Sequence, residues 1–199
     1  MSRWIVGMSG ASGTVYARRL LQVLSAERND IHIDLIISDG AYRVLKDEDG
    51  LDFSGKLETV EKIVGCSAPR ITLHNCRDTG ASVASGSSLA SGMVVIPASM
   101  NTIAGIAHGM ADNLLKRAAD VTLKEGRKLI VVPRETPLNT IHLRNLLTLS
   151  EMGVRVMPAM PGFYSRPRHL GELVDHFVMR VLDQMGIELN DLSPRWSGK

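Results

Sequence analysis

Short apolar runs alternate with longer amphipathic stretches along the whole chain. We predict buried strands where several apolar residues run together, and helices where apolar residues recur every three or four positions. The predicted strands are residues 4–8, 31–37, 71–73, 93–96, 128–132 and 154–157. The predicted helices are residues 13–26, 41–46, 57–64, 101–108, 113–124, 141–152 and about 170–185.

Strands that alternate with helices predict a mainly parallel sheet covered by helices on both faces. Right-handed crossovers then give an α/β fold of the doubly wound, Rossmann- or flavodoxin-like kind. No repeat or linker divides the chain, so we expect a single domain over residues 1–199, with 193–199 as an extended C-terminal tail. Pro97, Pro133 and Pro158 are expected to end their strands.

The composition limits the kinds of partner. Apolar residues make up 44% and charged residues 22%, as in globular proteins. A formal net charge of +2 and 4% aromatic residues argue against nucleic acid as the main partner. No run approaches the ~18 apolar residues of a membrane span, and the N-terminus has no signal peptide, so we expect a cytoplasmic protein. Two cysteines and six histidines form no metal-binding spacing, so no metal is expected.

The loop at residues 7–13, GMSGASG, joins the first predicted strand to the first predicted helix. Ligands of such sheets bind beyond the carboxyl ends of the strands. Glycines let backbone N–H groups approach an anion, Ser9 and Ser12 add hydroxyl donors, and the helix N-terminus adds partial positive charge. The spacing matches neither GxGxxG, nor a P-loop, nor a GxSxG elbow, which favours a mononucleotide phosphate at residues 9–13. The alternative is a tight turn with a serine cap.

Later strand ends carry polar residues that should gather at the same edge. They are Ser38, residues 99–102, the Arg134–Glu135 pair and residues 158–164. Arginine suits a phosphate or a flavin carbonyl, and glutamate suits proton transfer. The alternative for the pair is a solvated helix start.

Four other polar residues have equally ordinary explanations. Arg180 lies near the edge of the apolar arc of the last helix and fits a snorkelling arginine. Lys124 fits compensation of a helix dipole. Glu48 belongs to an acidic run that is typical of a solvent-facing surface, and His142, between two apolar residues, fits a packed side chain.

Eight motifs in one order resemble the UbiX flavin prenyltransferases, a family that includes the small subunits of phenolic acid and hydroxybenzoate decarboxylases. The motifs extend from residue 10 to residue 196, and the similarity begins at residue 3. They are GASG at 10–13, SGS at 85–87, RAADV at 117–121, LKE at 123–125, VPRE at 132–135, IHL at 141–143, PGFY at 161–164 and PRW at 194–196.

The resemblance implies an enzyme that joins a dimethylallyl group, from dimethylallyl phosphate, to N5 and C6 of reduced FMN without a metal. The product, prenylated FMN, would serve a separate UbiD-type decarboxylase. The family implies a homo-oligomer, typically a dodecamer, with sites at subunit interfaces.

The resemblance also assigns roles residue by residue. Arg134 would contribute to FMN binding from a neighbouring subunit, and Glu135 matches the acid/base of the family. Ser87, Glu48 and Lys124 match catalytic positions around the prenyl phosphate, which Tyr164, Arg180 and Lys124 would bind. The other FMN-binding positions are Gly10, Ala11, Ser12, Ser38, Ser99, Met100, Asn101 and Thr102.

Two departures and two alternatives remain at this stage. Many members carry a tryptophan just before the SGS loop, where this chain has no aromatic residue, and Ala98 replaces a common cysteine. One alternative is an FMN-dependent cysteine decarboxylase, acting on phosphopantothenoylcysteine or peptide C-termini, because residues 97–102 are similar to its PASANT motif. The other alternative is a flavin carrier without catalysis.

Overall fold

A parallel sheet lies at the centre of the computed structural model, which describes residues 2–53, 60–189 and 192–195. Within these residues the sheet has six strands in the order β3-β2-β1-β4-β5-β6, and every pairing is parallel. The strands are β1 (Ser2–Met8), β2 (Ile31–Ile37), β3 (Ile71–Asn75), β4 (Gly92–Ala98), β5 (Lys128–Pro133) and β6 (Arg155–Val156).

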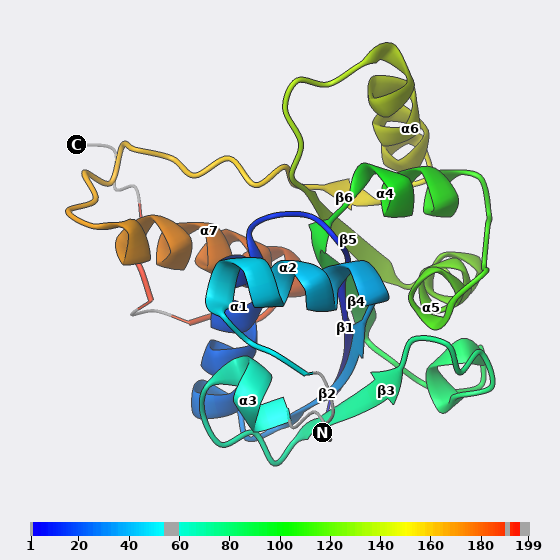
Figure 1. Cartoon of the computed structure of the whole chain (residues 1–199), viewed down its shortest axis with the longest axis horizontal. Coiled ribbons are helices and arrows are strands. Elements are labelled where there is room, and N and C mark those ends of the chain that lie inside the picture. Colours follow the sequence, from blue (N-terminus) through cyan, green and yellow to red (C-terminus); the bar gives the residue numbers. More distant parts are fainter. Residues whose placement is uncertain (1, 54–59, 190–191, 196–199) are drawn as a thin grey trace.

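Helices cover both faces of this sheet (Figure 1). One apolar cluster joins the sheet to α1 (Thr14–Glu27), α2 (Asp39–Asp49), α3 (Val60–Val64) and α7 (Leu170–Met185). The other joins it to α4 (Met100–Ala107), α5 (Leu114–Lys124) and α6 (Thr140–Glu151), with the 3₁₀ turn η1 (Ser82–Ala84). The doubly wound, Rossmann-like α/β fold predicted from the sequence is confirmed.

The residues of β1 show why the two layers form. Trp4, Val6 and Met8 point into the cluster beneath α1 and α7, whereas Ile5 points into the cluster beneath α5. A Cβ at Gly7 would lie 3.1 Å from the Leu115 Cγ, so glycine allows α5 to approach the strand closely. β1 and β4 are neighbours from which the chain winds in opposite directions, and such a switch point opens a crevice at the carboxyl ends of the strands.

Several element boundaries differ from the predictions. Pro97 does not end its strand, because β4 continues to Ala98, with an irregular register between Val95 and Ala98. The helix predicted at 41–46 extends over Asp39–Asp49, and the strand predicted at 154–157 is reduced to Arg155–Val156. The predicted helix 57–64 is described only from Val60, because residues 54–59 lie outside the described part of the chain.

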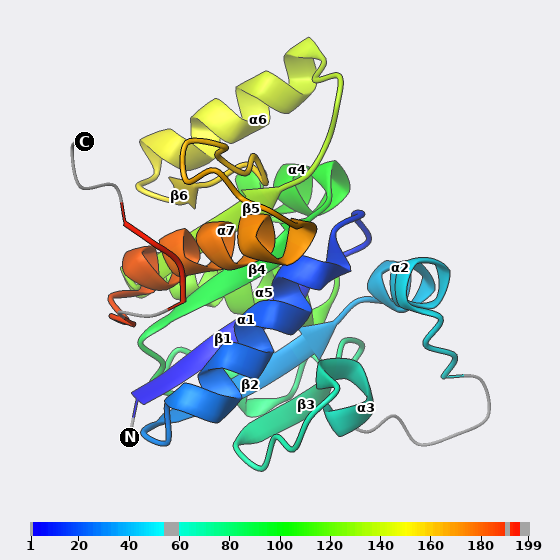
Figure 2. The ribbon, with the colours of Figure 1, turned by 90° about the vertical axis from the view of Figure 1, so that its left-hand side faces the viewer.

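α6 projects from the body of the molecule in both views (Figures 1 and 2). Its surface carries three large apolar side chains that are more than half exposed, Ile141, Leu143 and Leu147. His142, predicted to be packed, instead completes a capping box with Asn139 at the start of this helix. The segment after β6 crosses to α7 as an extended loop (Figure 1). Among the described residues, no helix is long and apolar enough to cross a membrane.

Candidate active site

The carboxyl ends of β1, β2 and β4 open onto one pocket of about 390 Å³. The residues predicted to bind a cofactor that line this pocket are Gly10, Ser38, Ser99, Asn101 and Thr102. The loops that carry them are far apart in sequence and meet because the sheet is parallel. The pocket is therefore the candidate cofactor site.

The N-termini of α2, α4 and α5 lie at this pocket, because their cap residues Ser38, Ser99 and Asn113 line it. The Ser38 hydroxyl accepts a hydrogen bond from the Ala41 N–H at 3.2 Å and caps α2. The Ser99 hydroxyl accepts one from the Thr102 N–H at 3.3 Å and caps α4. The first N–H groups of a helix have no partner within the helix and attract anions. The pocket therefore has the donors that a phosphate group needs.

A close contact between two glycines shapes the same wall. A Cβ at Gly10 would lie 3.1 Å from the Cα and carbonyl carbon of Gly40. Both glycines line the pocket, so a side chain at Gly10 would push the first loop away from the start of α2.

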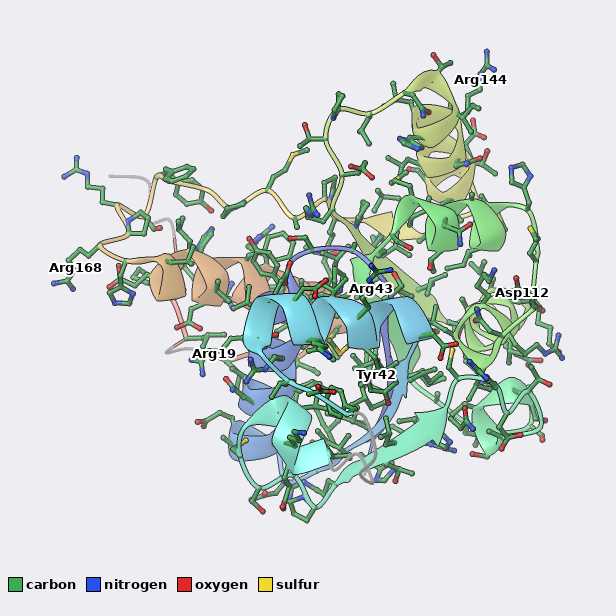
Figure 3. The ribbon with its side chains drawn as sticks, viewed as in Figure 1. Arg19, Tyr42, Arg43, Asp112, Arg144 and Arg168 are labelled. Atoms are coloured by element: carbon green, nitrogen blue, oxygen red, sulfur yellow. The ribbon has the colours of Figure 1, made fainter. Side chains whose placement is uncertain are left out.

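Two cations that the sequence analysis did not select also line the pocket, Lys116 and Arg77. The Lys116 ammonium pairs at 2.5 Å with Asp112, which lies beside the start of α5 in Figure 3, and only 6% of the lysine side chain is exposed. Arg77 pairs with Asp39 and is 79% exposed. A lysine among the buried residues of an apolar helix arc was the signal available in the sequence.

Ser9 is part of the framework of the pocket. Its buried hydroxyl donates to the Pro97 carbonyl at 3.0 Å and accepts from the Ser99 N–H at 2.7 Å. Both bonds tie the β1 loop to the β4 loop. The prediction that the Ser9 hydroxyl contacts a phosphate is therefore wrong.

Glu48 occupies the N-terminus of α1. Its carboxylate accepts hydrogen bonds from the Gly13 N–H at 3.0 Å, the Thr14 N–H at 3.0 Å and the Thr14 hydroxyl at 2.8 Å. Burial alone would raise the pKa of Glu48, but hydrogen bonds from Ser12, Thr14 and Gly13 hold it below its ordinary value. Asp47 and Glu48 are exposed, as expected for a solvent-facing run, but the Glu48 carboxylate also caps α1. With α1 capped by a carboxylate, the N-termini of α2, α4 and α5 remain at the pocket for a bound anion.

The other residues predicted at this edge lie beside the pocket. Ala11 and Met100 are buried. The Arg134 guanidinium donates to the Ser12 carbonyl of its own chain at 3.3 Å. The exposed Glu135 carboxylate accepts a hydrogen bond from the Thr136 N–H at 3.0 Å.

Ser87 and Lys124 lie at the opposite, amino-terminal edge of the sheet. The Ser87 hydroxyl bonds the Ser85 hydroxyl at 2.8 Å, and the Lys124 ammonium pairs with Glu125 at 3.0 Å. A Cβ at Gly86 would lie 3.2 Å from the Lys124 Nζ, so the serine loop and this lysine are neighbours.

Two arginines hold the serine loop against the sheet. Arg127 donates to the carbonyls of Gly86 and Ser88 at 2.6 and 2.9 Å. Arg3 donates to the hydroxyls of Ser88 and Ser82 at 2.6 and 3.1 Å. The loop that carries Ser87 is therefore anchored to the start of β1 and to Arg127, the residue just before β5.

Arg3 is itself held by a buried carboxylate. Asp34 accepts from the Arg3 guanidinium at 2.5 and 3.1 Å and lies 2.7 Å from the His74 Nε2. Burial would raise the pKa of Asp34, but the hydrogen bonds from Arg3 and His74 hold it below its ordinary value.

Tyr164 and Arg180 form a third group on α7 and the segment before it. The Tyr164 hydroxyl lies 2.7 Å from the Nε2 of His176, a residue that the sequence analysis did not select. Arg180 pairs with Asp183 at 3.2 Å and is half exposed.

The predicted site residues thus lie in three separate places. The pocket and the serine loop are at opposite ends of β1, whose 7 residues span about 20 Å at ~3.3 Å per residue. One chain therefore does not bring Ser87 and Lys124 to the pocket. Within the described residues no cluster of histidine, cysteine or carboxylate side chains fits a metal ion.

Comparisons with known proteins point in one direction. The family model described as Flavoprotein matches residues 1–181. The flavin prenyltransferase LpdB of Lactiplantibacillus plantarum is 45% identical over 198 residues, which is 100% of each chain.

Two solved structures resemble the chain over nearly its whole length. A dodecameric FMN-dependent Ubix-like decarboxylase from Escherichia coli O157:H7 has a TM-score of 0.87 and 44% identity, covering 98% of this chain and 100% of its own. AnUbiX (PadA1), in complex with FMN and dimethylallyl pyrophosphate, has a TM-score of 0.87 and 36% identity, covering 100% and 98%.

The cysteine decarboxylase alternative finds support in the fold alone. Peptidyl-cysteine decarboxylase EpiD is 17% identical with a TM-score of 0.58, over 93% of this chain and 99% of its own. At this identity the match shows shared architecture and says nothing of a shared reaction.

Proposed function

The chain belongs to the Flavoprotein family and, within it, to the flavin prenyltransferases, and from this premise we propose that it transfers a dimethylallyl group to reduced FMN. The observation that carries the proposal is the pocket at the carboxyl edge. Five of the residues assigned to FMN by motif line it, from three separate strand ends.

The pocket fits the phosphate end of FMN. The capped N-termini of α2 and α4 supply backbone donors, and the contact between Gly10 and Gly40 leaves no side chain in the way. Lys116 and Arg77 add positive charge. When bound, reduced FMN supplies the N5 and C6 atoms to which the dimethylallyl group becomes bonded.

The chain's own residues handle the leaving phosphate. We assign Lys124, Arg180 and the Tyr164 hydroxyl to its oxygens, because two cations and a hydroxyl donor stabilise the departing anion without a metal. Glu135, exposed at the end of β5, is assigned to proton transfer. Ser87 and Glu48 are placed beside the same phosphate by motif.

A shared site explains why these residues lie in three places. The pocket of one chain would receive Ser87 and Lys124 from a neighbouring chain, and the exposed apolar surface of α6 would be covered by subunit contact. The related structure from Escherichia coli O157:H7 is dodecameric, which supports a dodecamer here.

Three further assignments complete the proposal. The product is expected to serve a UbiD-type decarboxylase as prenylated FMN. Residues 1–199 are taken as one flavoprotein domain with a tail at 193–199, and the protein is taken to act in the cytoplasm.

The test is a flavin assay under anaerobic conditions. Purified protein, reduced FMN and dimethylallyl phosphate should release phosphate and yield a flavin heavier by one dimethylallyl group in mass spectrometry. Parallel reactions with dimethylallyl diphosphate test donor preference, which the missing aromatic residue before Ser85 leaves open. Unmodified FMN with both donors would refute the proposal.

A further inference from the structure

His176 is a buried histidine between the two α7-side residues assigned to the donor phosphate. Only 4% of it is exposed, and its Nε2 lies 2.7 Å from the Tyr164 hydroxyl. The two rings meet edge to face, with centroids 5.0 Å apart and planes at 89°. This packing leaves the imidazole little freedom to turn relative to the phenol.

The second ring nitrogen of His176 has a partner as well. Its Nδ1 lies 3.3 Å from the hydroxyl of Ser193, which is buried in the segment that follows α7. A continuous line of polar atoms therefore runs from the C-terminal segment through the imidazole to Tyr164.

The surroundings of His176 favour the neutral imidazole. Burial lowers the pKa of His176, and the positive charge of Arg180 lowers it further. A neutral imidazole has one N–H donor and one acceptor nitrogen, so the line has a direction.

The hydrogen bond between His176 and Tyr164 can be donated by either residue, and only one of these two arrangements allows Tyr164 to donate to a phosphate. If the Tyr164 hydroxyl donates to Nε2, its single hydrogen is used within the protein. If Nε2–H instead donates to the Tyr164 oxygen, His176 does not use the Tyr164 hydrogen, which a bound phosphate can then accept, and Nδ1 accepts from the Ser193 hydroxyl. A tyrosine that must donate to a phosphate requires the second arrangement.

We propose that His176 is a positioning residue that holds the Tyr164 hydroxyl so that its hydrogen points at the phosphate of the prenyl donor. Ser193 selects the required tautomer by donating to Nδ1. This inference rests on the proposed function, because it takes Tyr164 and Arg180 as the residues that bind the donor phosphate. It gives the segment after α7 a part in donor binding.

The decisive experiment is a double-mutant cycle between His176→Phe and Tyr164→Phe. Phenylalanine at 176 keeps an aromatic ring against Tyr164 and removes both hydrogen bonds. We expect a roughly tenfold higher KM for dimethylallyl phosphate in the single variant, the effect of one hydrogen bond to a charged group, with FMN affinity unchanged. In the Tyr164→Phe background the same change should have no further effect.

Three further variants separate positioning from folding. His176→Gln keeps an N–H donor near Tyr164 and should recover most of the affinity for the donor. Ser193→Ala should raise KM by a smaller factor, and only when His176 is present. The control His108→Phe removes a different histidine hydrogen bond, to Asn145, and should leave KM unchanged.

Calorimetric titration of dimethylallyl phosphate into the FMN-loaded protein provides the readout that does not depend on turnover. Equal losses of affinity from His176→Phe with and without the Tyr164 hydroxyl would overturn the inference, as would no loss at all. A wild-type protein that binds the donor but makes no modified flavin would refute the proposed function, while the binding cycle would still decide the role of His176.

Discussion

Replacing Asp34 by asparagine should destabilise the protein more than any exposed carboxylate change. Asp34 is 1% exposed, and its two oxygens receive three polar contacts, two from Arg3 and one from His74. The amide keeps one acceptor oxygen and turns the other position into a donor. At least one of the existing donors then faces an NH₂ group.

The contacts of Asp34 determine how much folding stability the substitution removes. Removing one partner of a buried ion pair costs about 3–5 kcal/mol. Because the Arg3 side chain is 29% exposed and water reaches it, we take the lower end, about 3 kcal/mol. That is roughly 150-fold in the folding equilibrium. With a denaturant slope of about 2 kcal/mol per molar urea, the midpoint should fall by about 1.5 M.

Urea unfolding followed by circular dichroism at one fixed protein concentration measures this shift. The control is Asp30→Asn, which removes a carboxylate from an exposed ion pair with Arg28 and should leave the midpoint unchanged. A midpoint for Asp34→Asn within about 0.3 M of the wild type would refute the reasoning, since it corresponds to a loss of less than about 0.6 kcal/mol.

Acid should narrow the difference between the two proteins. The pKa of Asp34 is lower in the folded protein than in the unfolded chain, where it is about 3.9. The stability that its charge contributes is therefore present above about pH 4 and is lost as the pH falls towards the folded value. Below pH 4 the gap should shrink by about 1.4 kcal/mol per pH unit. A gap that stays constant from pH 7 to about pH 3 would contradict the charge-based explanation.

Four further substitutions test the pocket and the residues beside it. Lys116→Met should weaken FMN binding about tenfold or more in a fluorescence titration, because the charge of a buried cation is poorly screened. Arg77 is exposed, so Arg77→Met should weaken FMN binding less, and its effect should disappear at high salt. A larger loss from Arg77→Met than from Lys116→Met would contradict the assignment. Gly10→Ala should weaken FMN binding because its Cβ meets the Gly40 backbone, and unchanged affinity would remove this contact from the argument. Glu135→Gln should bind FMN normally and turn over about a hundredfold more slowly, and an unchanged rate would exclude Glu135 from proton transfer.

The elements that could be predicted from the sequence are those with a local pattern. The apolar run 31–37 and the amphipathic stretch 170–185 match β2 and α7 residue for residue, because strand and helix periods are read within one segment. Pro97 misled the prediction, because the irregular register of β4 accommodates a residue without an N–H inside the strand.

The pocket could be predicted in outline, because a parallel sheet brings the ends of its strands to one edge. The side-chain contacts that modify the pocket could not be predicted. Glu48 reaches α1 from 34 residues away in the chain, and the burial of Lys116 and His176 depends on how whole helices pack. The resemblance gathered Ser87 and Gly10 into one site, but motifs do not say whether two residues act in the same copy of the chain.

The length of β1 between the pocket and the serine loop has a genetic consequence. If neighbouring chains complete each other's sites, each active site takes Gly10 from one chain and Ser87 from its neighbour. A substitution at Gly10 and a substitution at Ser87 then damage the parts that different chains supply. Two inactive variants, one of each kind, would then restore some intact centres when they assemble together. Two alleles of a single gene, each without activity alone, would complement one another in the same cell.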